Sequence, residues 1–258
     1  MYVVVVSAHA PGHTGQAGLS AAVGAGRCDV CGHVGEFVQI DAPTRESHLC
    51  GSCDATLRYR AQAAAIAAAY GSPELTLSEL IEVPAFRELE IYEPGIAGPL
   101  RYVLGRLPHY LNSYYWPDVD LGESQEGVRC EDLRALTFAD KSFDLVVSSD
   151  ILEHVRGPMD AFSELHRILR PGGMHIFTVP MIWPLPSTTE SRVDYSGAED
   201  RHLKEPVYHG SPTDPQGSLV YTDFGMDLPE SLREVGFETT THHGYRNAIT
   251  FVSRKPSG

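Results

Sequence analysis

The sequence predicts an α/β protein in which helices cover both faces of a mostly parallel sheet, with a small cysteine-containing module ahead of it. Three observations support this prediction. From Glu88 onward, short apolar runs alternate with helical patterns, which is typical of βαβ units. A glycine-containing turn at residues 93–98 lies between a strand and a helix, and two Cys-x-x-Cys pairs lie within residues 28–53. A chain of 258 residues with 42% hydrophobic content can bury one such core and still form a small satellite.

The start of the chain has the composition of a linker. Residues 8–27 are rich in Gly, Ala and Ser without a hydrophobic period, and the apolar run at residues 2–6 lacks the basic stretch of a signal peptide. An edge strand is the alternative for that run. We therefore expect a flexible leader at residues 1–27, a zinc-ribbon-like module with its helices at 28–83, and the main domain at 84–258.

The four clustered cysteines predict a structural zinc site. Cys28-x-x-Cys31 and Cys50-x-x-Cys53 are separated by eighteen residues, a spacing typical of four-thiolate zinc ribbons. Such a closed site leaves no position for substrate and would stabilise a module that has little core of its own. Two reduced, metal-free pairs are the alternative. Cys130 stands apart and is expected to be a buried strand residue.

Two helices are expected behind the cysteines. Asp54 is a plausible N-cap of the first, alanine-rich helix, and Gly71 follows its last turn. Ser72 and Pro73 predict the N-cap and first residue of a second, short helix that runs through Leu80.

Apolar patterning predicts the centre of the main domain. Residues 89–92 form a first strand, and residues 143–148 form a strand of the buried, continuous kind. Between residues 158 and 169 the apolar positions fall on one helical face. The Arg-Pro-Gly-Gly sequence at 170–173 should end that helix, and residues 174–179 should form the next strand.

The last third of the chain contains an insertion and then a helix and two strands. Residues 181–218 are dense in Pro, Ser, Thr, Asp and His, and they are too many for an ordinary connection. We expect this insertion to cover a binding site as a lid. A helix at residues 227–235 should end at Gly236, followed by strands at 237–242 and 249–253.

The charge of the chain argues against polyanionic partners. Its formal net charge is −14, and no run of Lys and Arg would attract a nucleic acid or an anionic membrane, although Arg45, Arg58 and Arg60 leave a small local patch open. No stretch approaches the roughly 20 apolar residues of a membrane span. We expect a cytoplasmic protein that acts on a neutral or cationic small molecule, with a homodimer left open.

Several motifs in the main domain resemble those of one family. The strand Phe-Asp-Leu-Val-Val-Ser-Ser-Asp at 143–150 is followed by Leu-Glu-His-Val at 152–155, a helix, Leu-Arg-Pro-Gly-Gly at 169–173 and a strand ending in Val-Pro. This order resembles class I S-adenosylmethionine (SAM)-dependent methyltransferases of type 11, over roughly residues 89–180. The resemblance implies a Rossmann-like, mostly parallel sheet of seven strands, SAM as the cofactor and methyl transfer as the activity.

The resemblance also implies roles for single residues. Glu93, Gly95 and Gly98 would hold the methionine portion of SAM, since glycines let the backbone approach a ligand closely. Asp132 and Leu133 would border the adenine.

Two further positions concern the sulfonium and the ribose. Ser149 and Asp150 would lie beside the sulfonium, because an unpaired buried cation is costly. Tyr114 stands where related sequences have an acid for the ribose hydroxyls, so either Asp118 or Asp120 replaces it, SAM binds more weakly, or catalysis has been lost.

Two histidines are the candidates for proton transfer. His154 lies just past the strand at 143–148, and His209 lies in the insertion. His154 could instead bond to backbone, and His209 could be a structural residue of the insertion. A second metal site built from Glu153, His154, His202 and His209 is a further alternative, although no local ligand spacing supports it.

Together these observations predict a SAM-dependent methyltransferase that modifies an oxygen or nitrogen atom of a secondary metabolite or sugar-containing compound. Two other functions are considered. The chain could be a catalytically degenerate scaffold with the methyltransferase fold, or a zinc-ribbon adaptor that binds a protein or a nucleic acid.

Overall fold

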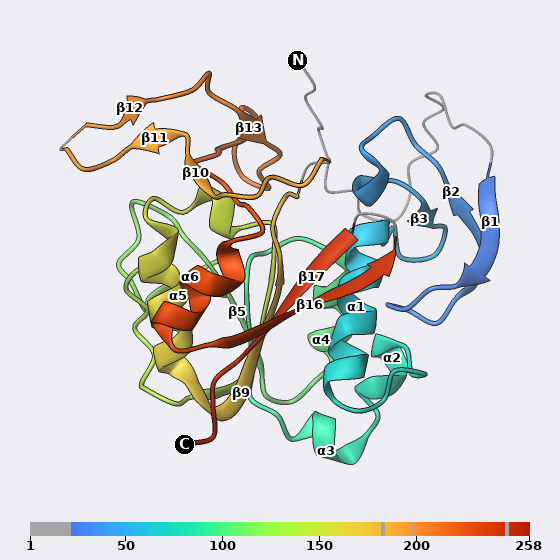
Figure 1. The fold of residues 1–258 in the computed structure, drawn as a ribbon. Helices are drawn as coiled ribbons and strands as arrows, with labels where there is room; N and C mark the ends of the chain where they lie inside the picture. Colours follow the sequence, from blue (N-terminus) through green and yellow to red (C-terminus); the bar gives the residue numbers. More distant parts are fainter. Residues whose placement is uncertain (1–21, 182–183, 198, 246–247) are drawn as a thin grey trace.

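A computed structural model of the chain describes residues 22–181, 184–197, 199–245 and 248–258 (Figure 1). Its centre is an eight-stranded sheet with the order β16-β17-β9-β8-β4-β5-β7-β6. The strands are β4 (Ile91–Pro94), β5 (Tyr110–Tyr114), β6 (Ser124–Gln125), β7 (Val128–Cys130), β8 (Phe143–Ser149), β9 (Leu169–Thr178), β16 (Glu238–Tyr245) and β17 (Ala248–Arg254).

The direction of the strands confirms the predicted Rossmann-like fold of the class I methyltransferase kind. Strands β7, β5, β4, β8 and β9 are parallel, and β17 runs antiparallel to both β9 and β16. The seven strands expected are joined by an eighth, because β6 and β7 form a hairpin across Glu126 and Gly127. Both turn residues have positive φ, 52° and 80°, as a two-residue hairpin turn of the type I′ class requires.

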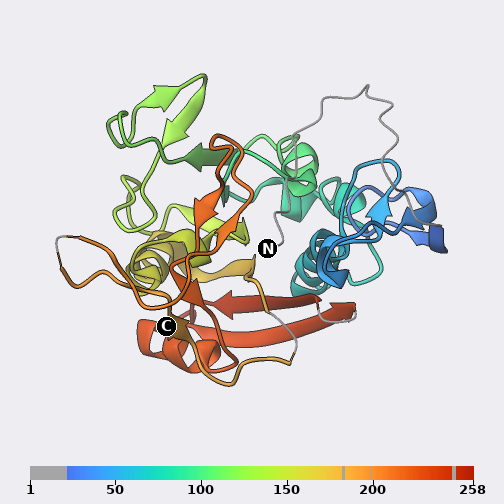
Figure 2. The same cartoon turned by 90° about the horizontal axis from the view of Figure 1, so that it is seen from above.

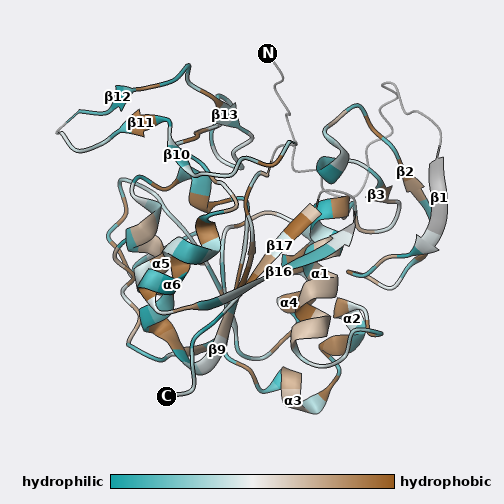
Figure 3. Cartoon of the chain, in the orientation of Figure 1, coloured by the Kyte–Doolittle hydropathy of each residue, from teal (hydrophilic) through white to brown (hydrophobic). Residues whose placement is uncertain are grey.

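Helices cover both faces of this sheet (Figures 1 and 3), and the side chains of β8 alternate between the two layers. Leu145 and Val147 of β8 belong to the core beneath α1 (Leu57–Ala69), α2 (Leu77–Leu80) and α4 (Pro99–Leu104). Val146 of the same strand belongs to the core beneath α5 (Pro158–Ile168) and α6 (Leu228–Val235). A third short helix, α3 (Pro84–Arg87), leads from the first layer into β4.

Two predicted helix starts are wrong. The N-cap of α1 is Thr56, because Asp54 lies in a turn with φ of 55°. The helix expected from Ser72 begins only after Thr76, whose amide and hydroxyl both donate to the Glu79 carboxylate at 2.9 and 3.0 Å. This capping box ties Thr76 to Glu79, and the first two amides of α2, those of Leu77 and Ser78, donate to the carbonyls of Asp29 and Val30 at 2.7 and 3.0 Å.

The predicted ends of α1 and α6 agree with the structure. Gly71 follows α1 with φ of 73°, and Gly236 ends α6 with φ of 111°. However, β9 already begins at Leu169, so residues 170–173 lie inside a strand and do not separate it from α5.

The N-terminal part of the described chain is a three-stranded antiparallel sheet of β1 (Ala22–Arg27), β2 (Val34–Val38) and β3 (Leu49–Cys50), with a 3₁₀ helix, η1 (Thr44–Glu46), before β3. Residues 1–21 of the expected leader lie outside the described residues, and its last six residues form β1. Helix α1 packs against β9, β16 and β17, so one hydrophobic core joins this part of the chain to the main sheet.

The insertion forms three short two-stranded pieces. They pair β10 (Glu190–Ser191) with β15 (Thr222–Asp223), β11 (Val193–Asp194) with β12 (Arg201–His202), and β13 (Tyr208–His209) with β14 (Ser218–Leu219). In both views the insertion and the three-stranded sheet lie on opposite sides of the same end of the main sheet (Figures 1 and 2). Among the described helices, none is long and apolar enough to cross a membrane.

Candidate functional site

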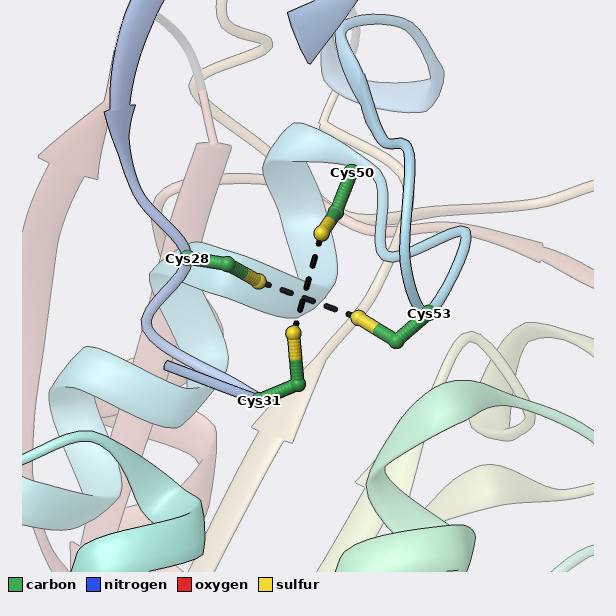
Figure 4. Close-up of side chains that lie close together, drawn as sticks. All are labelled: Cys28, Cys31, Cys50 and Cys53. Atoms are coloured by element: carbon green, nitrogen blue, oxygen red, sulfur yellow. Dashed lines mark hydrogen bonds between the residues drawn. The ribbon is translucent and has the colours of Figure 1, made fainter. Parts of the chain in front are cut away.

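The four predicted cysteines lie together in the N-terminal module (Figure 4). The Sγ atoms of Cys28 and Cys53 are 3.8 Å apart, and those of Cys31 and Cys50 are 3.7 Å apart. A disulfide would bring sulfurs to about 2.05 Å. Around Zn²⁺, with a Zn–S distance of about 2.3 Å, a tetrahedron places its corners about 3.8 Å apart. The separations therefore fit a four-thiolate zinc site.

The backbone builds the two halves of this cluster in the same way. The amide of Gly32 donates to the carbonyl of Cys28, and the amide of Asp54 donates to the carbonyl of Cys50, both at 2.9 Å. Gly32 and Asp54 both have positive φ, 78° and 55°. Asp54 is thus the second copy of the turn residue Gly32, which explains why it does not cap α1. Each turn directs the two sulfurs of its pair toward the centre of the cluster.

The predicted SAM residues begin at the carboxyl end of β4. Glu93 is buried and accepts a hydrogen bond from the Tyr110 hydroxyl at 2.8 Å. Burial raises the pKa of Glu93 to about 7, because it outweighs the opposite effect of that hydrogen bond. Gly95 donates its amide to the Ser113 carbonyl at 2.7 Å and has φ of 121°, so the turn depends on glycine here.

A residue that the sequence did not indicate lies against the second glycine of this turn. Gly98 has φ of 112°, and a Cβ atom at this position would come within 2.8 Å of the Tyr59 hydroxyl. Tyr59 belongs to α1, so the helix that follows the cysteines closes one side of the glycine turn.

The end of β8 is also covered by α1. Gln62 is fully buried, and its side-chain NH₂ donates to the carbonyls of Ser148 and Ile176 at 2.9 and 3.1 Å. The Ser149 hydroxyl donates to the Gln62 side-chain oxygen at 2.6 Å. One amide from α1 therefore bridges β8 and β9 where SAM was expected to contact Ser149.

Asp150 is fully engaged by arginines of the N-terminal module. Its carboxylate accepts two hydrogen bonds from Arg45, at 2.5 and 3.0 Å, and one from the Thr178 hydroxyl at 2.8 Å. Arg58 lies 3.3 Å away, and Glu46 pairs with both arginines. Burial alone would raise the pKa of Asp150, but the two guanidinium groups hold it well below its usual range. Asp150, predicted to lie beside the sulfonium, is therefore already paired with two guanidinium groups.

The residues predicted for the adenine and ribose lie on the β5 and β7 side of β4, across from β8. Asp132 is paired with Arg134 at 2.5 Å, and this pairing lowers the pKa of Asp132 although burial acts in the opposite direction. Leu133 is buried in the core. Tyr114 is the last residue of β5, as expected, and its hydroxyl lies 2.8 Å from the Thr213 hydroxyl of the insertion.

The two predicted catalytic histidines meet beside Glu153. Their rings are 5.2 Å apart and nearly perpendicular, and one nitrogen of each lies 3.6 Å (His154) and 3.8 Å (His209) from the same Glu153 oxygen. His154 also makes the backbone contact that we considered, since its Nδ1 atom lies 2.8 Å from the Leu219 carbonyl. His202 is exposed on β12 and is not part of this group.

Comparisons with known proteins agree with the central motifs. Residues 118–177 match the family described as a methyltransferase domain. A malonyl-[acyl-carrier protein] O-methyltransferase of Marinomonas is 32% identical over 73 residues, which are 28% of this chain and 27% of that protein. An uncharacterized methyltransferase of Mycobacterium marinum is 31% identical over 102 residues, which are 38% of each chain. The chain thus spans about a quarter to two fifths of the curated relatives that it matches.

The solved structures with a similar chain path include two methyltransferases. A SAM-dependent methyltransferase from Mesorhizobium loti has 19% identity and a TM-score of 0.41, over 69% of this chain and 99% of that one. A SAM-bound amino pentose methyltransferase from Micromonospora echinaspora has 12% identity and a TM-score of 0.45, over 69% of this chain and 88% of that one.

Proposed function

We propose that the chain is a SAM-dependent methyltransferase that methylates an oxygen or nitrogen atom of a small molecule, such as a secondary metabolite or a sugar-containing compound. One observation carries this proposal. The turn at Glu93–Gly98 follows β4, and β4 is the strand at which the sheet order reverses, with β5 and β7 on one side and β8 and β9 on the other. Open α/β sheets bind their ligands outside the carboxyl ends of the strands at such a point.

The residues at this point can carry out the tasks of methyl transfer. Bound SAM would supply the methyl group by in-line displacement, so the protein has to align the acceptor and remove a proton. Glu93, once ionised, would pair with the ammonium group of the methionine portion. His154 and His209 supply the basic nitrogens on the acceptor side, next to the insertion. We also propose that the four cysteines hold a structural Zn²⁺ ion.

The proposal is tested by calorimetry with SAM, followed by an assay for S-adenosylhomocysteine release over a panel of hydroxyl and amine compounds. We expect saturable binding of SAM and release of the product with at least one class of acceptor. Absence of binding at millimolar SAM would remove the premise.

A catalytically degenerate scaffold is the second candidate, and Tyr114 favours it because a tyrosine replaces the expected ribose-binding acid. Such a scaffold would release no S-adenosylhomocysteine with any acceptor, even where SAM binds.

A further inference from the structure

We propose that Glu153, His154 and His209 form a second metal site, which binds one divalent first-row transition-metal ion. The three residues each place one ligand atom within 4.8 Å of the other two. The site is separate from the four cysteines and lies where the insertion meets the loop after β8.

Glu153 is an uncompensated buried carboxylate. The Glu153 side chain is 1% exposed, and neither of its oxygens has a hydrogen-bond partner among the described residues. A buried charge without a partner is strongly unfavourable, so native proteins pair such groups or coordinate a metal with them. The two closest cationic or cation-binding groups are the imidazoles of His154 and His209.

The His154 ring points its Nε2 atom toward Glu153. Its Nδ1 atom faces the Leu219 carbonyl at 2.8 Å, and a carbonyl can only accept, so Nδ1 carries a proton. In the neutral imidazole the Nε2 atom then has a free lone pair, and this atom faces Glu153 at 3.6 Å. The Nε2 lone pair and the Glu153 carboxylate oxygen are both hydrogen-bond acceptors, so they cannot bond to each other. A cation between them would satisfy both. A backbone carbonyl that orients the outer nitrogen is also the usual partner of a metal-bound histidine.

The spacing and chemistry of the three side chains suit a transition-metal ion. Ligands at about 2.1 Å from Zn²⁺ in a tetrahedron lie about 3.4 Å apart, and the observed separations from the Glu153 oxygen are 3.6 and 3.8 Å. Two imidazoles and one carboxylate suit Zn, Fe, Co or Mn, whereas Mg and Ca prefer oxygen ligands alone. Three protein ligands leave at least one position open for water or another molecule.

The site would fasten the insertion to the main sheet. Glu153 and His154 lie in the 3₁₀ helix η2 (Leu152–His154), and His209 lies in β13 of the insertion. The Tyr221 amide donates to the Glu153 carbonyl at 2.7 Å, so the backbone of this segment already contacts the end of the insertion. If the proposed function holds, the open position of the metal would bind the hydroxyl or amine of the acceptor and lower the pKa of that group, so that its proton passes to solvent water. With the metal bound, His154 and His209 would serve as its ligands and not as the proton acceptors.

The experiment is a Co²⁺ titration of the full chain that already holds one equivalent of Zn²⁺ at the cysteines. Visible absorption reports the coordination, since a thiolate site gives strong sulfur-to-cobalt charge transfer and a nitrogen-and-oxygen site does not. We expect one further, saturable equivalent of Co²⁺ without charge-transfer bands. Glu153→Gln and His209→Ala should each weaken it by more than the roughly 10–100-fold that loss of an outer-shell partner costs.

His202→Ala is the matched control, because it removes an exposed histidine of the same insertion that lies outside the cluster. It should keep the second equivalent unchanged. The proposal is overturned if the unmodified chain takes up no further Co²⁺, which an imidazolium–carboxylate pair in place of a metal would produce. It is also overturned if both cluster variants still bind the ion, which would place it elsewhere. Circular dichroism checks that each variant is folded. Calorimetry with SAM on the same samples separates the two proposals, since loss of metal binding with SAM binding intact leaves the methyltransferase proposal standing.

Discussion

Two carboxylates, the half-buried Asp150 and the buried Glu153, lie three residues apart after β8, and their surroundings are opposite. Asp150 faces the N-terminal module, where Arg45 and Arg58 neutralise it and Thr178 completes its hydrogen bonds. Glu153 faces the insertion and has no hydrogen-bond partner among the described residues. The first carboxylate is complete without a ligand, whereas the second lacks a cation. We infer that the Asp150 side of this edge, the docking side, holds the N-terminal module against the main sheet. The Glu153 side, the binding side, is built to bind a cation.

The docking side depends first on the cysteine cluster, and its loss should have the largest effect. Cys50→Ser removes one of four thiolates, and structural zinc sites contribute on the order of 10 kcal/mol in small zinc domains. We expect the variant to lose most of its zinc and to unfold its N-terminal module at a much lower temperature. Elemental analysis and thermal unfolding measure both effects.

Cys130→Ser is the control for that change. Cys130 is buried in β7, as predicted, and its thiol donates to the carbonyls of Trp116 and Val119, far from the other four sulfurs. Its variant should keep a full equivalent of zinc. Equal zinc contents in the two variants would contradict a four-cysteine site.

Changing each of the two carboxylates to its amide tests whether they contribute differently to stability. The protein used holds zinc at the cysteines and no other metal. Asp150→Asn leaves the half-buried Arg45 and the buried Arg58 with Glu46 but without the Asp150 charge. The loss should therefore approach the lower end of the about 3–5 kcal/mol that breaking a buried pair costs. Glu153→Gln removes an uncompensated charge, so it should leave the free energy of unfolding unchanged or raise it by about 1 kcal/mol. Denaturant unfolding near pH 8 measures both.

An exposed ion pair of the insertion serves as the reference for these two stability changes. Arg201 and Asp194 form an ion pair of the insertion in which the arginine side chain is 74% exposed, and such pairs contribute about 0–1 kcal/mol. Asp194→Asn should therefore change stability little. Equal losses at Asp150 and Glu153 would remove the distinction between a docking side and a binding side.

Glu93 lies between the two sides and should make stability depend on pH. Its pKa is about 7 in the folded chain, because it is buried, and about 4.3 when unfolded. Between these two pH values the folded chain keeps a proton on Glu93 that the unfolded chain has lost. The stabilisation from this proton is fully present below about pH 4, and the free energy of unfolding falls as pH rises to about 7. The difference is on the order of 3 kcal/mol.

Glu93→Gln should lack that slope, so its stability relative to the unmodified chain should rise between pH 4 and 7.5. Glu88→Gln, at an exposed glutamate just before β4, should follow the unmodified chain. SAM affinity should also increase through pH 7 only where Glu93 is present, since only the ionised carboxylate pairs with an ammonium group. A parallel course of all three stability curves would contradict the raised pKa.

The sequence predicted those parts of the structure that depend on local patterns. The apolar period of α5, the buried run of β8 and the spacing of the four cysteines each lie within a short stretch of chain, and the structure bears out the two elements and brings the cysteines together. The helix starts near Asp54 and Ser72 failed for local reasons as well, since a positive φ and a nearby capping box prevailed.

The contacts that define the candidate site could not be predicted in this way. Arg45 and Asp150 are 105 residues apart, and Gln62 and Ser149 are 87 apart. The packing of α1, and of η1 beside it, on the main sheet brings them together, and no local pattern marks an arginine or a glutamine for such a role. Glu153 and the two histidines were considered as ligands, but their approach depends on how the insertion folds back onto the loop after β8.

The smallest expected effect concerns Tyr114→Phe. Tyr114 is the last residue of β5, and its hydroxyl contacts the insertion. Tyr114→Phe removes only the contact with the Thr213 hydroxyl, so SAM affinity should change less than about threefold. Tyr114→Glu supplies the carboxylate that ribose hydroxyls prefer, and charge-assisted hydrogen bonds of about 1.5–3 kcal/mol should raise SAM affinity about tenfold or more. Calorimetry measures both variants. No gain with the glutamate, despite a native fold, would mean that ribose does not lie at β5, and it would favour the scaffold over the methyltransferase.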